Sequence, residues 1–251
     1  MPTAPIEPVV AGVDGTLSSV HAVDLAAEEA TVRVAPLVVV YTVEPEDDPA
    51  RLPAHRRLLD LVVSQAQAEH PGLSVSADLV YGEPVDALLR WSTRACLLVV
   101  GHREGALTGR SVAADVAARA TVPVIVYRPR AEHQPTGGGP VLVGVSAAAG
   151  TEAVVAFAFE EAELRGAPVV AVSVGGERPL VEALGGWPAK YPEVELRLHV
   201  PSGTDALVAA AHDGAVVVVG SERQGPELGA TARRLIDTAG CPVAVVSDLL
   251  G

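Results

Sequence analysis

Short apolar runs alternate along the chain with longer stretches of mixed polarity. In the first half, the apolar runs are Val9–Val13, Leu37–Val43, Leu73–Tyr81, Leu97–Val100 and Pro123–Tyr127. Most of these runs are continuously apolar, a pattern typical of strands buried on both faces of a parallel sheet that helices cover. The stretches between the runs predict the covering helices, at Ser18–Val32, Leu52–Glu69, Val85–Thr93 and Ser111–Ala120.

The second half of the chain shows the same pattern. Its apolar runs are Val141–Val145, Val169–Val174, Val194–Val200, Ala215–Val219 and Val243–Val246. Its predicted helices are Thr151–Arg165, Leu180–Ala189, Thr204–His212 and Leu228–Ala239. The third run of each half alternates between polar and apolar residues, which we expect of a strand near the edge of a sheet.

Four short segments of the first half return in the same order in the second half. Two of them return 132 positions later, and they are Val9–Asp14 and Glu28–Ala30. The other two return 119 positions later, and they are Val99–Gly101 and Pro123–Val124. Such ordered self-similarity indicates that the chain is a tandem duplication.

The predicted fold class is α/β, with two tandem doubly wound domains that each contain a five-stranded parallel sheet. Between the two copies, the stretch from Arg128 to Pro140 is dense in proline and glycine and has no apolar periodicity. This composition is typical of an exposed linker. We therefore predict a first domain over residues 1–130, a linker over 131–139 and a second domain over 140–251.

The composition excludes several classes of function. The 251 residues include 18 basic and 31 acidic side chains, so the net charge is −13, which disfavours nucleic acids and anionic membrane surfaces as partners. No apolar stretch reaches the roughly 18 residues that span a bilayer. The start of the chain lacks the pattern of a signal peptide, and we expect a cytoplasmic protein. Cys96, Cys241 and the scattered histidines lack metal-ligand spacing, so no metal site is predicted.

A ligand site is predicted beyond the carboxyl ends of the strands, where the strand order of an open parallel sheet reverses. In the order 3-2-1-4-5, this crevice lies between the first and fourth strands, which are followed by Asp14 and by a glycine-rich loop. A carboxylate there can accept hydrogen bonds from a base amine or a ribose hydroxyl, and amides at the next helix start attract phosphate. The candidate loop residues are Gly101, Gly105, Gly109 and Ser111.

Each of these residues also has a purely structural interpretation. Asp14 could cap the helix that follows it, and Ser111 could be only the N-cap of the fourth helix. His102 follows the fourth strand, but no Ser or Cys nucleophile has a recognisable context beside it. We expect a solvated loop histidine at this position, and we predict no catalytic residue.

Several segments resemble the universal stress protein family in its tandem two-domain form. They are Val10–Thr16, Ala26–Ala30 and the fourth-strand loop that leads into Ala120–Val126. The resemblance covers nearly the whole chain. It implies five parallel strands in the order 3-2-1-4-5 in each domain, association through the fifth strand and a role in stress resistance.

In one subclass, the family resemblance also implies ATP or another adenine nucleotide in the crevice. The subclass is marked by the motif Gly-x2-Gly-x9-Gly-Ser/Thr. The first copy retains Asp14, Gly101, Ser111 and Val112, and has Thr42 where the family often has valine. However, Gly101 and Ser111 are ten positions apart instead of fourteen, and the second and third motif glycines are replaced by Glu104 and Arg110.

The second copy departs further from this motif. Gly220 and Gly229 are nine positions apart instead of thirteen, and Ala230 replaces the motif serine or threonine. Ser146 stands where the first copy has Asp14. We therefore expect nucleotide binding, if any, in the first domain only.

The sequence leaves three functions open. The first is a non-enzymatic stress-response regulatory protein that binds an adenine nucleotide in its first domain. The second is a protein-interaction scaffold that binds no nucleotide and acts on partner proteins that the sequence does not identify. The third and least supported is a slow ATP hydrolase, because that chemistry needs Mg²⁺ and a complete phosphate cradle. We expect that the chain is not an enzyme.

The two fifth strands, Pro123–Tyr127 and Pro242–Val246, would be exposed apolar edges if each domain stood alone. We predict that they pair with each other inside one chain. Assembly of two such chains into a homodimer is compatible with this prediction.

Overall fold

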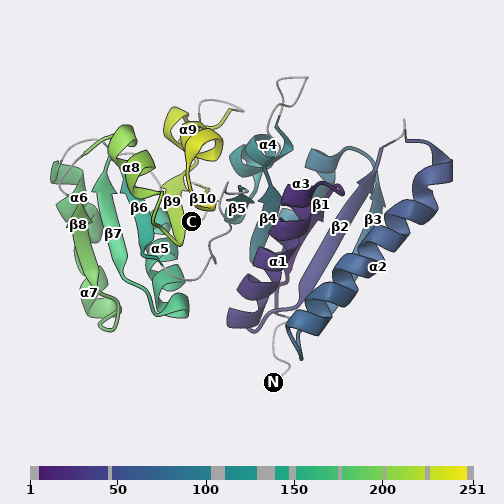
Figure 1. The fold of residues 1–251 in the computed structure, drawn as a ribbon. Coiled ribbons are helices and arrows are strands. Elements are labelled where there is room, and N and C mark those ends of the chain that lie inside the picture. Colours follow the sequence, from purple (N-terminus) through teal and green to yellow (C-terminus); the bar gives the residue numbers. More distant parts are fainter. Residues whose placement is uncertain are drawn as a thin grey trace. The chain divides into compact units, whose positions relative to one another are not determined.

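The computed structural model describes residues 6–44, 47–102, 111–128, 139–146, 151–174, 177–199, 202–223 and 227–247. The chain forms two compact units, which divide at Tyr127 and Arg128 except that Ala117–Arg119 group with the second unit. Of the predicted linker, only Gly139 is among the described residues. Helices cover the strands in each unit (Figure 1).

The sheet of the first unit is parallel and has the strand order β3-β2-β1-β4-β5, which confirms the predicted α/β class and topology. Its strands are β1 Val9–Val13, β2 Leu37–Val43, β3 Val75–Tyr81, β4 Leu97–Gly101 and β5 Val124–Tyr127. Its helices are α1 Leu17–Val32, α2 Leu52–Glu69, α3 Pro84–Ser92 and α4 Val112–Arg119. Right-handed crossovers that step in one direction from β1 to β3 bring α1 and α2 to the same face of the sheet (Figure 1).

The second unit repeats this topology in the order β8-β7-β6-β9-β10. Its strands are β6 Val141–Val145, β7 Val169–Ser173, β8 Leu196–His199, β9 Val216–Gly220 and β10 Val243–Val246. Its helices are α5 Thr151–Arg165, α6 Glu177–Leu184, α7 Trp187–Lys190, α8 Thr204–Ala210 and α9 Ala230–Thr238.

One predicted helix of the second unit, Leu180–Ala189, is in fact two. The helix α6 ends at Leu184, and Gly186 adopts a left-handed backbone with a φ of 87°. A new turn of helix, α7, starts at Trp187 with Pro188 in its first turn. Glycine favours this conformation and proline suits a helix start, so these residues interrupt the helix.

The packing inside the two units preserves the duplication. A β-carbon at Gly12 in β1 would lie 3.2 Å from Cδ1 of Leu88 in α3. A β-carbon at Gly144 in β6 would lie 2.6 Å from Cδ2 of Leu207 in α8. In both units, a glycine of the central strand leaves room for a leucine of the helix behind it.

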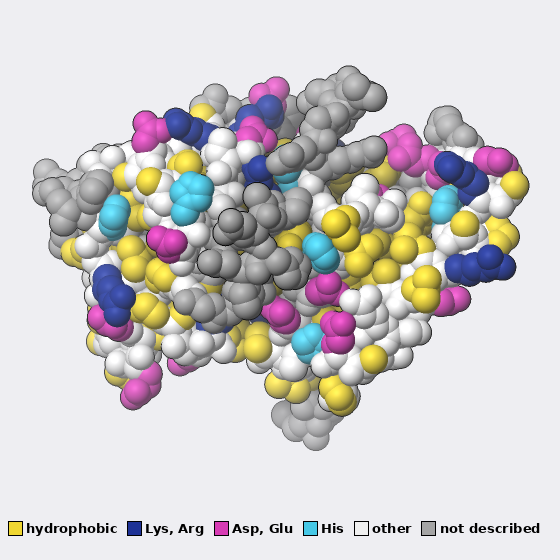
Figure 2. Space-filling view, viewed as in Figure 1, with side chains coloured by type: hydrophobic (Ala, Val, Ile, Leu, Met, Phe, Trp, Pro, Cys, Tyr) yellow, Lys and Arg dark blue, Asp and Glu magenta, His cyan; other side chains and the backbone are white. Residues whose placement is uncertain are grey.

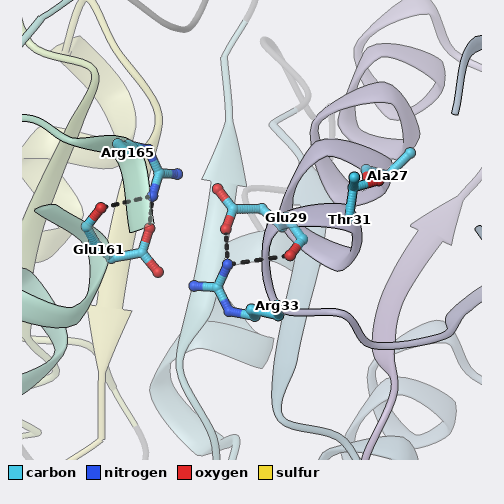
Figure 3. A network of polar contacts seen from close by, with 6 residues as sticks. All are labelled: Ala27, Glu29, Thr31, Arg33, Glu161 and Arg165. Atoms are coloured by element: carbon cyan, nitrogen blue, oxygen red, sulfur yellow. Dashed lines mark hydrogen bonds and ion pairs between the residues drawn. The ribbon is translucent and has the colours of Figure 1, made fainter. Parts of the chain in front are cut away.

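A buried ion pair also recurs in both units (Figure 3). Glu29 of α1 is 1% exposed and Glu161 of α5 is 0% exposed. The carboxylates form ion pairs with Arg33 and Arg165, one turn later in the same helices. These arginines also donate to the backbone carbonyls of their glutamates, at 3.3 and 3.4 Å. Burial of an unpaired carboxylate costs several kcal/mol, so the arginines allow the glutamates to lie inside.

Candidate functional site

The carboxyl ends of β2, β1 and β4 bring three of the predicted positions to one edge of the first sheet. The strand β1 is paired in register with β2 on one side and with β4 on the other. Asp14 therefore follows its strand between Thr42 and the Gly101–His102 step. This is the point where the chain order reverses across the sheet, and it is the position at which the crevice is predicted.

Asp14 accepts hydrogen bonds from Thr16, the N-cap residue of α1. Its Oδ1 accepts hydrogen bonds from the backbone N–H of Thr16 at 2.9 Å and from the Thr16 hydroxyl at 2.6 Å. The backbone N–H of Asp14 donates to Ser19 Oγ at 3.2 Å. The N-cap itself is Thr16, whose hydroxyl accepts a hydrogen bond from the backbone N–H of Ser19 at 3.3 Å. Asp14 therefore does not cap α1 directly but orients the residue that does. Asp14 is nevertheless exposed at the edge of the sheet.

Gly101 lies against the first turn of α1. A β-carbon at this position would lie 2.8 Å from the carbonyl carbon and oxygen of Ser18 and from the amide nitrogen of Ser19. Packing of β4 against α1 therefore requires glycine here, independently of any ligand. Ser18 is itself buried, and its hydroxyl has no hydrogen-bond partner among the described residues.

Ser111 is the N-cap of α4. Its Oγ accepts a hydrogen bond from the backbone N–H of Ala114 at 3.3 Å. A hydroxyl that accepts this bond still has a proton to donate, so the capping role is compatible with contact to an anion. Val112 beside it is 41% exposed. The other two predicted loop residues, Gly105 and Gly109, lie outside the described residues.

His102 is buried, with 8% of its surface exposed. The expectation of a solvated loop histidine is wrong. The backbone N–H of His102 donates to the carbonyl of Tyr127 at 2.7 Å, so the pairing of β4 with β5 continues one residue beyond the strand. The sequence contains no signal of this extension, because it depends on where the neighbouring strand ends.

Two further residues at this edge were not predicted. The rings of Tyr41 and His55 are stacked, with centroids 4.6 Å apart and planes at 29°. Tyr41 lies near the end of β2, and His55 lies in α2. The Nδ1 of His55 is buried and has no hydrogen-bond partner among the described residues. The only feature of the sequence that pointed to this stack is Tyr41 itself, an aromatic residue near the end of a strand that is otherwise almost entirely aliphatic.

The edge beside β1 and β2 carries negative charge. Burial raises the pKa of the Tyr41 hydroxyl, and the charges of Asp47 and Asp14 raise it further. The backbone N–H of Glu44 donates to Asp47 Oδ2 at 2.8 Å, which holds a second carboxylate near the loop after β2. Carboxylates repel phosphate but accept hydrogen bonds from neutral groups. This part of the edge therefore suits a base or a ribose better than a phosphate.

The equivalent edge of the second unit differs in chemistry. Ser146 follows β6 in the place of Asp14, and its carbonyl accepts a hydrogen bond from the Thr151 hydroxyl at 3.1 Å. Ser221 follows β9 in the place of His102 and is fully buried. Gly229 is the N-cap of α9 and supplies no side-chain cap. A hydroxyl in place of a carboxylate removes the strongest acceptor from this edge.

In the part of the chain that the structure describes, no three His, Cys, Asp or Glu side chains are grouped so that they could hold a metal ion. None of the helices described is both long and apolar enough to cross a membrane.

Comparison with known proteins gives a consistent result. Residues 5–128 match the model of the universal stress protein family. The chain is 30% identical over 243 residues to a universal stress protein of Mycobacterium tuberculosis, covering 86% of this chain and 89% of that protein. It is 27% identical to a universal stress protein of Mycolicibacterium smegmatis, over 95% of this chain and 96% of the other.

Solved structures show a similar fold. A universal stress protein from Archaeoglobus fulgidus superposes with a TM-score of 0.79, at 16% identity and over 96% of both chains. At this identity the likeness concerns the fold alone, and it extends over both units.

Proposed function

Because this chain belongs to the universal stress protein family, we propose that it is a non-enzymatic stress-response regulatory protein whose first unit binds an adenine nucleotide. The observation that carries the proposal is the exposed Asp14 carboxylate at the point where β1 and β4 diverge. Ligands of open parallel sheets bind at this point. The second unit has Ser146 there and is assigned no nucleotide.

The charge distribution suggests how the nucleotide is oriented. The base and the ribose lie toward β1 and β2, where Asp14 accepts hydrogen bonds and Thr42 lies beside them. The phosphate lies toward the start of α4, away from the carboxylates of Glu44 and Asp47. Helix amides there favour an anion. The residues assigned to this side are Gly101, Gly105, Gly109, Ser111 and Val112.

The proposal assigns no catalytic residue and no metal. The loop between Gly101 and Ser111 is four positions shorter than the family's phosphate-binding motif. Phosphoryl transfer depends on a complete cradle that positions the phosphates and Mg²⁺. A slow ATP hydrolase is therefore the least supported alternative. Phosphate release from ATP that is no faster than in an Asp14→Ala variant would eliminate it.

Titration calorimetry of the full chain with ATP and with AMP tests nucleotide binding. We expect one site per chain, and we expect Asp14→Ala to weaken binding at least tenfold, because a charged acceptor is lost. Ser146→Ala is the matched control at the equivalent position of the second unit and leaves the affinity unchanged. Equal losses in both variants would contradict the assignment to the first unit.

A protein-interaction scaffold without a nucleotide is the second candidate. It is favoured by the structural roles of two motif residues, since Gly101 is required by packing and Ser111 caps its own helix. Absence of heat with both ATP and AMP, together with unchanged thermal stability, would favour the scaffold.

The fifth strands support a proposal about domain association. Within its own unit, β5 pairs only with β4 and β10 pairs only with β9, which leaves each with one edge for pairing. We propose that these edges pair inside one cytoplasmic chain, whose domains are residues 1–130 and 140–251 joined by a linker over 131–139. Slow hydrogen exchange of the β5 and β10 amides that do not bond β4 or β9 would support this pairing, and rapid exchange would oppose it.

A further inference from the structure

The strands β3 and β8 are the end strands of their units, and they differ in their protection. The strand β8 has four residues and contains Arg197, which donates to both carboxylate oxygens of Glu195, the residue before the strand, at 2.9 and 2.6 Å. The strand β3 has seven residues, and Asp78 is its single charge. Short length and charged side chains protect an edge strand from pairing with another chain. The short, charged β8 has this protection, and the longer, mostly uncharged β3 does not.

In β3, the backbone N–H and C=O groups of every second residue point away from β2. The backbone N–H of Leu37 donates to the carbonyl of Ser74 at 2.9 Å, and that of Gly82 donates to the carbonyl of Val43 at 3.0 Å. The even-numbered residues of β3 therefore bond β2. The N–H and C=O groups of the odd-numbered residues point outward, at Ala77, Leu79 and Tyr81.

Among the described residues, only one side chain bonds this outward row. Gln67 of α2 donates to the carbonyl of Val75 at 3.4 Å, at the amino end of the strand. The outward groups of Ala77, Leu79 and Tyr81 have no partner in the part of the chain that the structure describes.

The side chains of these three residues share one face of the sheet, because alternate residues of a strand point to the same side. Ala77 is exposed, Leu79 is half-buried and Tyr81 is 65% exposed. Figure 1 shows β3 at the end of the first sheet, with α2 over it. The outward row of peptide groups is thus accompanied by an apolar strip.

We propose that β3 is an interaction edge for β3 of a second copy of this chain. A two-fold axis joins the same strand of two copies in antiparallel orientation. The favoured register sets Leu79 opposite the second copy's Leu79 and Ala77 opposite the second copy's Tyr81. Each facing pair then exchanges two backbone hydrogen bonds. The Leu79–Leu79 pair and the two Ala77–Tyr81 pairs give about six bonds in all.

Side-chain size and charge favour a second copy of β3 as the partner, and they favour this register over a shifted one. The exposed Tyr81 ring lies over the small Ala77 of the other copy on both sides of the axis. Asp78 lies opposite Val80 of the other copy, whereas a shift of the axis by one residue would set the two Asp78 carboxylates directly opposite each other. Directly opposed like charges are destabilising. The strip is therefore complementary to itself.

Sedimentation velocity of the full chain over a range of concentrations tests the proposal. We expect a dimer whose dissociation constant decreases with added salt, because each copy carries a net charge of −13. Ala77→Pro removes an outward N–H without touching the bonds to β2, and Ala77→Glu adds a charge to the apolar strip. Both variants are expected to raise the dissociation constant at least tenfold while the circular dichroism spectrum is retained.

Leu198→Glu is the matched control, since Leu198 stands in β8 where Ala77 stands in β3. It is expected to leave the dissociation constant unchanged. A single-chain mass at every concentration and salt level would overturn the proposal. So would a dimer that survives in both Ala77 variants, or one that Leu198→Glu dissociates.

Discussion

Gly101 at the end of β4 lies directly against the backbone of Ser18 in α1, with 2.8 Å between the place of a β-carbon and the Ser18 carbonyl group. A side chain can turn away from an added methyl group, but a helix backbone cannot. The contact joins a residue of the predicted phosphate loop to the first turn of α1, whose N-cap residue Thr16 donates to Asp14. It makes this edge of the sheet rigid at the point where a ligand is proposed.

Gly101→Ala is therefore expected to destabilise the chain by about 2 kcal/mol, within the range for overpacked cores. Gly12→Ala is the control, because the nearest atoms there belong to the flexible end of Leu88, at 3.2 Å. It should cost about 1 kcal/mol or less. Urea unfolding of both variants checks that Gly101→Ala loses more free energy of unfolding than Gly12→Ala. Equal losses would show that the contact with Ser18 relaxes easily.

Val34 adopts a left-handed backbone after α1, with a φ of 54°, and is 80% exposed. Gly166 stands at the equivalent place after α5, with a φ of 60°. The two helix ends share the same hydrogen bonds, in which Ala35 donates to Ala30 and Ala167 donates to Ala162, both at 2.9 Å.

A β-branched residue is strained in this conformation by about 1–2 kcal/mol. Val34→Gly is expected to stabilise the chain by roughly 0.5–1 kcal/mol after the greater flexibility of glycine in the unfolded state is subtracted. The reciprocal change, Gly166→Val, should destabilise it by roughly 0.5–1 kcal/mol, because the same two effects act with opposite sign. Thermal unfolding of both variants checks the signs, and a destabilised Val34→Gly variant would contradict the argument.

The buried Glu29–Arg33 pair leads to a third prediction. Glu29→Ala leaves the arginine, which is 15% exposed, without its carboxylate. We expect a loss of about 3 kcal/mol, as for other broken buried pairs, and a similar loss for Glu161→Ala. The exposed Glu160, which precedes Glu161 in α5, supplies the control, since Glu160→Ala should change stability by about 0.5 kcal/mol or less. Urea is the suitable denaturant, because guanidinium chloride screens ion pairs.

Asp24 leads to a prediction about pH. Acidic and histidine side chains gather over α1 (Figure 2). Burial raises the pKa of Asp24 above its ordinary value of 3.8, and the charge of Glu69 raises it further, while His21 and His70 oppose the increase. The folded chain therefore binds this proton more tightly than the unfolded chain does. Ionisation of Asp24 lowers stability as pH rises through the folded pKa.

Asp24→Asn removes this penalty. We expect the variant to be more stable than the wild type at pH 7, with a difference that disappears as pH falls toward 3.8. Unfolding midpoints measured between pH 3.5 and 7.5 check this trend, where the pH limits are about the range over which carboxylates titrate. A difference that grows at acid pH would have the wrong sign for a raised pKa.

The strands were predictable because β-branched runs of strand length recur at regular intervals. Their order was implied by the resemblance to the universal stress protein family. The position of Asp14 followed from the same reasoning, since a residue that ends the first strand of this topology lies at the reversal point. The capping role of Ser111 was also readable from its residue type before a helix. These features depend on neighbours that are close in sequence or on the order of the strands.

Other features could not be predicted from local pattern. His102 is buried because β5 continues beside it, and Tyr41 is stacked on His55 because α2 crosses over β2. The helix predicted over Leu180–Ala189 is divided at Gly186, where the backbone conformation outweighs the apolar periodicity.

The sequence alone determined that this chain has two copies of one parallel α/β unit, because strand-sized apolar runs and their repetition are properties of the residues themselves. Only the tertiary structure decided which side chains meet. Gly101 lies against Ser18 and Tyr41 stacks on His55 because helices pack on strands, and the row on β3 is unpaired because β3 is the end strand of its unit. The energies of these contacts depend on distances of a few ångströms, and those distances exist only after the helices have packed on the sheet.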